Sequence, residues 1–83
     1  MITYEKVQKD YPGFQVIGIE SVWFPGRGWT SWMEIYKLGT EGLSRDEILQ
    51  RSFEQGAEKV QLILATPKGR MIWSDYHRNE LLK

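Results

Sequence analysis

Apolar and polar positions alternate at helical spacing most clearly between Leu43 and Lys59. Ser44 followed by Glu47 forms a capping box, and Leu43 before the cap pairs with Ile48 as a hydrophobic staple. The positions that share one face of this helix are apolar or small: Ile48, Leu49, Ser52, Phe53, Gly56, Ala57 and Val60. The pattern predicts a central amphipathic helix that packs on a broad, flat surface such as a sheet.

Two β-rich segments precede this helix. Phe14–Phe24 is rich in β-branched and aromatic residues and predicts a long strand. Pro25–Gly28 has the composition of a turn, and Trp29–Leu38 is predicted to return as a second strand. An even loop would place Phe24 opposite Trp29, whereas an odd loop would shift the register and exchange the faces. With either register, both faces of this hairpin carry apolar side chains.

Two further strands are predicted after the helix. Val60–Thr66 and Arg70–Ser74 are apolar segments of strand length. They are joined by Thr66–Gly69, which has proline at the second position of a type I turn and Gly69 suited to a left-handed bulge position. Both faces of this hairpin have apolar members: one face carries Leu62, Leu64 and Ile72, and the other carries Ile63, Ala65, Met71 and Trp73. If the first hairpin tip is not the recognition site, the face around Ile63, Met71 and Trp73 is the expected binding surface.

The two ends of the chain are predicted to be short helices. Thr3 can cap a helix that ends at Pro12, and this Pro-Gly stop favours the helix although the same residues also alternate as a strand would. Ser74 or Asp75 can cap a tail helix over Tyr76–Leu82, which would be marginal unless it docks on the rest of the molecule.

These elements predict one small α+β domain over residues 1–83. Its mostly antiparallel four-stranded sheet is built from two β-hairpins, with the central amphipathic helix between them in sequence and short helices at the termini. That helix can cover only one face of the sheet. Whatever the terminal segments leave bare on the other face is expected to meet a partner or a second copy of the chain.

Composition narrows the possible functions. Eleven basic and eleven acidic residues cancel, so the broad positive field of a bulk-electrostatic nucleic-acid binder is missing. The absence of cysteine excludes disulfides, thiolate catalysis and cysteine-based metal sites. No signal-like segment and no apolar run near the roughly 20 residues of a membrane span is present, so we expect a cytoplasmic protein with no membrane partner.

The sequence offers little for catalysis. His77 is the only histidine, so a zinc site would need three carboxylates, which zinc seldom uses, and we expect no metal or cofactor. Ser74–His77 contains the residue types of a hydrolase triad, but triads are assembled in space, and the segment is expected to cap a tail helix with His77 exposed in its first turn. Glu20 and Glu34 point to opposite faces in the even register and cannot flank one glycosidic bond. We therefore expect no enzyme activity and no small-molecule substrate.

Aromatic residues are the more informative feature. Trp23, Phe24, Trp29 and Trp32 gather near the tip of the first predicted hairpin, around Arg27. Trp and Arg are enriched among interface hot spots because they combine a large buried area with a polar group. Most such rings belong to the core of a small domain, but these occupy both faces of the hairpin. Arg27 lies between two glycines and is expected to stand in solvent with few contacts.

Cations at the second tip suggest an alternative. If the two hairpin tips share an edge, Arg27 would join the second-tip cations in a basic and aromatic patch suited to single-stranded nucleic acid. The candidate partner-binding residues are Trp23, Arg27, Trp29, Trp32, Lys68, Arg70 and Trp73. The leading hypothesis is a non-enzymatic protein-binding module, either a homodimer or a modulator that docks on a larger protein, of the kind that phages and mobile elements often encode. The alternative is binding of RNA or single-stranded DNA through the hairpin tips.

Overall fold

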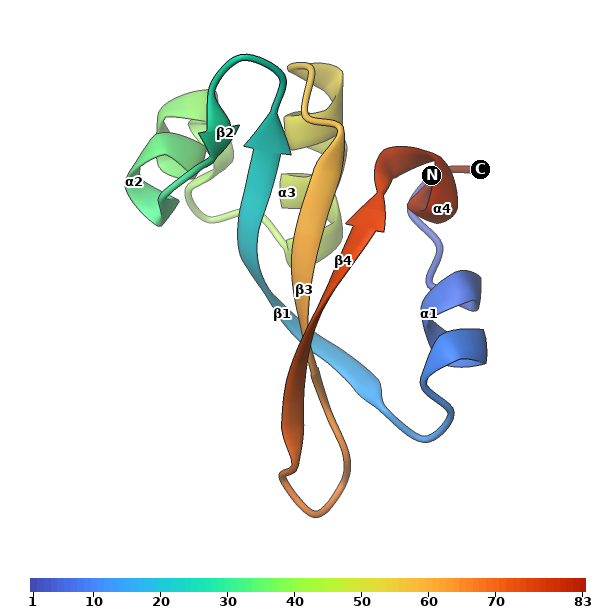
Figure 1. Ribbon diagram of the computed structural model, residues 1–83. Coiled ribbons are helices and arrows are strands. Elements are labelled where there is room, and N and C mark those ends of the chain that lie inside the picture. The colour runs from blue at the N-terminus through green and yellow to red at the C-terminus, as the bar shows by residue number, and fades with distance from the viewer.

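One antiparallel sheet with strand order β2-β1-β3-β4 organises the molecule, and helices pack on one of its faces (Figure 1). The computed structural model describes all residues from Met1 to Lys83. The elements in chain order are α1 (Glu5–Asp10), β1 (Gln15–Phe24), β2 (Gly28–Trp29), α2 (Trp32–Ile35), the π-helical turn η1 (Tyr36–Thr40), α3 (Arg45–Glu54), β3 (Lys59–Ala65), β4 (Met71–His77) and α4 (Arg78–Leu81). The predicted α+β fold, with a four-stranded sheet and a central helix, is confirmed.

Helix α3 is the predicted central helix. Ser44 caps it by accepting a hydrogen bond from the Glu47 backbone, and the Glu47 side chain closes the capping box. Phe53 is buried in the core that α3 shares with the sheet. The helix ends at Glu54, earlier than predicted, because Gly56 adopts φ +106° and turns the chain towards β3.

All the helices contribute to a single hydrophobic core. One buried cluster contains residues from α1, α2, α3 and α4 together with one face of the strands. Its members are Val7, Ile19, Val22, Phe24, Ile35, Ile48, Leu49, Phe53, Ala57, Val60, Leu62, Leu64, Tyr76 and Leu81. The face of the sheet that points into this core is the inner face, and the opposite face is called the outer face.

The second predicted strand forms, but it is much shorter than predicted. β2 contains only Gly28 and Trp29, and its register pairs Trp23 with Trp29 through an odd loop rather than the even one. Ser31 then caps α2 by accepting a hydrogen bond from the Glu34 backbone at 3.3 Å, and Glu34 completes a second capping box. The segment forms a helix in spite of its β-like composition, because this capping box satisfies backbone N–H groups locally. In a strand the same groups would need a neighbouring strand as their partner.

The terminal helices form, but with other caps. Tyr4, not Thr3, occupies the N-cap of α1, and its side chain makes no capping bond. At the other end β4 continues to His77, which itself caps α4, so Ser74 and Asp75 are strand residues paired with β3. Both termini lie together beside α4 (Figure 1).

None of the helices has the length and apolar character required to cross a membrane.

The second hairpin matches its prediction closely. The Gly69 backbone donates to the Thr66 carbonyl at 2.9 Å, and Gly69 has φ +86°, as expected for a turn followed by a left-handed position. β3 and β4 pair without interruption from Lys59↔His77 to Ala65↔Met71. The pairing of β1 with β3 is shifted twice along its length, which marks two bulges in β1.

Candidate functional site

The outer face of the sheet carries an apolar strip near the β3–β4 turn. Ile63 lies between Gly18 of β1 and Trp73 of β4, and in the next row Ala65 pairs with Met71. Side chains paired directly across antiparallel strands stand on the same face. Ile17, the additional residue at the first bulge of β1, lies beside this row. We call the surface made by Ile17, Ile63, Met71 and Trp73 the outer-face strip.

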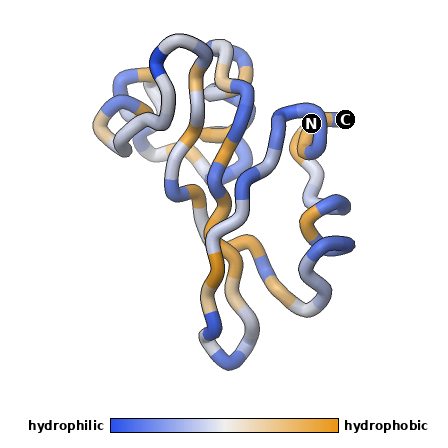
Figure 2. The backbone as a smooth tube through the Cα atoms, in the orientation of Figure 1, coloured by the Kyte–Doolittle hydropathy of each residue, from blue (hydrophilic) through white to orange (hydrophobic).

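The strip is open to solvent. Ile17, Met71 and Trp73 keep 52%, 49% and 50% of their surfaces exposed, unlike the inner-face residues Leu62 and Leu64, which are fully buried. Gly18 leaves the flank of Ile63 uncovered, since a methyl group there would meet the Ile63 Cδ1 at 3.7 Å. Figure 2 shows apolar positions along the strands in this region and a hydrophilic turn at their tip. An exposed apolar surface of this kind is typical of interaction sites.

At the other end of the outer face, Lys59 contacts two tryptophan rings, and Trp29 stays 44% exposed. The Lys59 Nζ lies 4.3 Å from the centre of the Trp23 ring and 5.8 Å from that of Trp29. Cation–π contacts of this type hold both rings against the strand. Gln61 and Asp75 pair with each other between this end and the strip, so the outer face is apolar at both ends and polar in the middle.

Arg27 is exposed at the first hairpin tip, as expected, but it is not free of contacts. Its guanidinium pairs with Glu34 at 3.0 Å and lies over the Phe24 ring. The Ser31 backbone amide, together with Arg27, holds the pKa of the Glu34 carboxyl below its usual value. Arg27 therefore ties the β1–β2 turn to the start of α2.

The predicted cluster of tryptophans at this tip is divided. Trp23 and Trp29 pair across β1 and β2, whereas Trp32 belongs to α2 and packs against Tyr36 with ring centres 5.7 Å apart. Because the predicted strand is replaced by α2, Trp32 no longer shares a hairpin face with the other two rings.

The two hairpin tips lie at opposite ends of the sheet (Figure 1). Trp23 near the first tip pairs with the start of β3, whereas Lys68 and Arg70 follow the end of β3. The prediction of a single basic patch that joins Arg27 to Lys68 and Arg70 is therefore wrong. Lys68 and Arg70 remain exposed at the β3–β4 turn, and neither forms an ion pair.

The residues with catalytic potential are engaged in local structure. The His77 Nδ1 accepts a hydrogen bond from the Asn79 backbone at 3.2 Å, so His77 is a half-buried helix cap and not the exposed first-turn residue expected. Glu34 is likewise held by its capping box and by Arg27. No group of three His, Cys, Asp or Glu side chains is placed to hold a metal ion.

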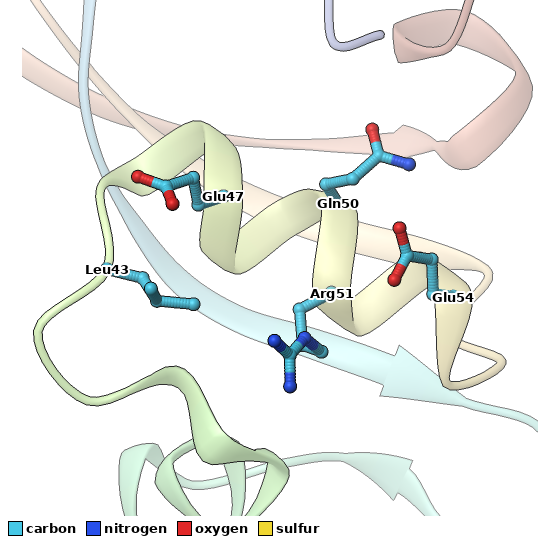
Figure 3. Close-up of a pocket in the computed structure, with 5 residues that line it drawn as sticks. All are labelled: Leu43, Glu47, Gln50, Arg51 and Glu54. Atoms are coloured by element: carbon cyan, nitrogen blue, oxygen red, sulfur yellow. The ribbon is translucent and has the colours of Figure 1, made fainter.

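A shallow depression lies along the solvent side of α3. Figure 3 shows Arg51 directed towards η1, where its Nη1 donates to the Leu38 carbonyl at 3.3 Å. The side chains that line the depression are Leu43, Glu47, Gln50, Arg51 and Glu54. Glu47 is committed to the cap of Ser44, and no nucleophile faces a base here. The depression offers no catalytic arrangement.

Of the candidate residues predicted from the sequence, only Trp73 belongs to the outer-face strip. The predicted alternation of β3 and β4 already placed Ile63 and Met71 on one face with Trp73, and the observed pairing of Ile63 with Trp73 and of Ala65 with Met71 confirms that face. Ile17 had no such signal, since a bulge determines its side of the sheet. Comparison with protein-family models, with curated proteins and with solved structures found no match to this chain.

Proposed function

We propose that this protein is a non-enzymatic binding module that docks on another protein through its outer-face strip. One observation carries the proposal: apolar side chains stand half exposed on the sheet face that no helix covers. Burying a half-exposed tryptophan and its aliphatic neighbours gives a hydrophobic gain that an isolated monomer forgoes. Trp73 is the natural anchor, because tryptophan is the residue most often found at the energetic centre of interfaces.

The exposed tip of the β3–β4 hairpin supports a second candidate. Lys68 and Arg70 are cations without ion-pair partners, and they follow the strip directly at the β3–β4 turn. Stacking on Trp73 combined with phosphate contacts from these cations would suit single-stranded RNA or DNA. Phosphate contacts make affinity fall steeply with salt, whereas apolar docking does not, so salt dependence separates the two functions.

Affinity capture from a lysate of the native cells, with and without nuclease, tests the proposal. We expect the wild-type chain to retain a defined protein after nuclease treatment and in high salt. Trp73→Ser should weaken that capture about tenfold or more, since it removes the anchor ring. Lys68→Ser is the matched control on the same hairpin and should retain the protein as the wild type does.

Two results would contradict protein docking. Material retained only without nuclease, and lost with Lys68→Ser as well as with Trp73→Ser, would assign the surface to nucleic acid. Equal capture by the wild type and Trp73→Ser would remove the outer-face strip as the binding surface.

A further inference from the structure

β4 has an open hydrogen-bonding edge. It is the last strand of the sheet and pairs only with β3. Two hydrogen bonds determine which residues face β3: the Thr66 backbone donates to the Arg70 carbonyl, and the Arg78 backbone donates to the Glu58 carbonyl. Along an antiparallel strand the main-chain groups of successive residues point to alternate sides. Even-numbered residues of β4 therefore bond to β3.

The odd-numbered residues of β4 direct their main-chain groups outwards. These residues are Met71, Trp73 and Asp75, together with His77, whose N–H already bonds to the Glu80 carboxylate at 3.0 Å. The first three each offer one N–H and one C=O to an incoming strand. Their side chains lie on the outer face, so the open edge adjoins the outer-face strip.

The two edges of the sheet differ in how well they are protected. At one edge β2 has only two residues and β1 carries two bulges, which are features that discourage strand addition. β4 has seven residues in unbroken register and contains no Pro, Lys or Arg. A regular, mostly uncharged edge of this length is a site for pairing with another strand.

We propose that β4 pairs antiparallel with β4 of a second copy, about a two-fold axis at Trp73, so that two sheets join into one. This dimer does not depend on the docking function proposed above, because it uses the edge of the sheet and leaves the outer face open. It extends that function by bringing two outer-face strips together into one broader surface.

The register follows from the open groups. Centred on Trp73, the pairing places Trp73 against its own copy and Met71 against Asp75 of the other chain, so every outward N–H and C=O of these residues finds a partner. Centred on Ser74, it would place Met71 against His77, whose N–H is already occupied. The open edge therefore selects the Trp73-centred register.

Charge favours a second copy as the occupant. The chain has no net charge at pH 7, so two copies do not repel each other at long range. In this register Asp75 faces a methionine rather than another carboxylate. Arg70 stands opposite Tyr76 of the other chain. The hydroxyl of this tyrosine donates to the Asp10 carboxylate at 2.8 Å. The Arg70 guanidinium therefore approaches the Asp10 carboxylate of the other chain on the inner side of the joined sheet.

Proline at an outward position tests the edge. Asp75→Pro removes an N–H that does not bond to β3 and places the ring in the path of the second strand. Asp75→Ala is the matched control that keeps the N–H. By light scattering at about 10 to about 100 µM we expect dimers for the wild type and Asp75→Ala, and a monomer with a native circular-dichroism spectrum for Asp75→Pro. A monomeric wild type, or a folded Asp75→Pro that is as dimeric as the wild type, would overturn the proposal.

Single cysteines test the register without relying on proline, since the chain has no cysteine of its own. Residue 73 would face itself at a Cα separation of about 5.5 Å, within the range of a disulfide, whereas residue 75 would lie about 15 Å from its copy. Under mild oxidation Trp73→Cys should form a covalent dimer at least about tenfold faster than Asp75→Cys. Equal rates, or faster linkage at residue 75, would overturn the Trp73-centred pairing.

The capture experiment distinguishes failure of the dimer from failure of docking. A monomeric Asp75→Pro chain that still retains the nuclease-resistant protein supports docking independently of the dimer. A wild-type dimer that retains nothing contradicts docking and leaves the edge pairing intact.

Discussion

Single residues hold α3 on the sheet in two different ways. Phe53 is almost completely removed from water in the core, where its ring fills space between α3 and the strands. Ser44 lies at the exposed start of the same helix and acts only through its capping hydrogen bond. The first contribution is made by packing and the second by a local backbone bond, so their removal should differ in cost.

Truncation of these two side chains should separate the two contributions. Phe53→Ala should lower the free energy of unfolding by about 3–5 kcal/mol, because it leaves a cavity in the core. Ser44→Ala should lower it by about 0.5–2 kcal/mol, and Glu54→Ala at an exposed site should stay within about 0.5 kcal/mol. Urea denaturation measures all three. An unchanged midpoint for Phe53→Ala would contradict the packing of α3.

Titration of Asp10 should make stability depend on pH. The Lys6 ammonium, followed by the Tyr76 hydroxyl, lowers the pKa of Asp10 below its ordinary value of 3.8. Because this pKa is lower in the folded state than in the unfolded chain, the Asp10 carboxylate stabilises the fold at pH values above 3.8. This stabilisation is lost as the pH falls through the folded pKa. Burial and then the bond to Asp10 raise the pKa of Tyr76 above 10.0, so its contribution is present below pH 10.0 and is lost at higher pH.

Asp10→Asn should therefore reduce the slope of stability against pH on the acid side. Urea midpoints between about pH 2 and about pH 6 measure the slope. Glu54→Gln, which changes an exposed carboxylate that forms no ion pair, is the control. Equal slopes for the wild type and Asp10→Asn would show that Asp10 does not couple folding to protons.

At the scale of elements, the segment after Trp29 shows a competition between composition and capping. Its β-branched and aromatic residues favour a strand, but Ser31 and Glu34 start a helix and Gly39 with φ +78° ends the turn that follows. Ile35 is fully buried in the core from this helical position. The segment thus closes one end of the core instead of extending the sheet.

Removal of the Ser31 cap tests this arrangement. Ser31→Ala should lower the free energy of unfolding by about 0.5–2 kcal/mol, as expected for an N-cap. Lys37→Ala, an exposed control in the same segment, should have little effect. A strand over this region would have no cap to lose, so an unchanged stability for Ser31→Ala would favour it.

At the scale of the whole molecule, the helices and the core lie on one side of the sheet and the outer-face strip lies on the other. This asymmetry predicts that the native protein binds a hydrophobic dye. Ile17→Ser and Trp73→Ser should each lower the fluorescence of bound anilinonaphthalene sulfonate, because they remove exposed apolar surface. Lys68→Ser should leave the fluorescence unchanged. Equal fluorescence in all the variants would place the exposed apolar surface elsewhere.

The sequence by itself determined the features that depend on neighbouring residues. The capping box of Ser44 and the turn ending at Gly69 form as predicted, because their hydrogen bonds and torsions are set within a few residues. Trp73 remains a predicted binding residue, and the structure shows it half exposed on the outer face. The order of helices and strands also followed from the pattern, except after Trp29.

Only the tertiary structure decided the features that depend on distant segments. The bulges that place Ile17 on the outer face arise where β1 meets β3, and the length of β4 depends on its pairing as far as His77. The separation of Arg27 from Lys68 depends on the direction of β3 relative to β1. Register, bulges and strand ends are chosen by contacts between residues far apart in the chain, so no local pattern specifies them.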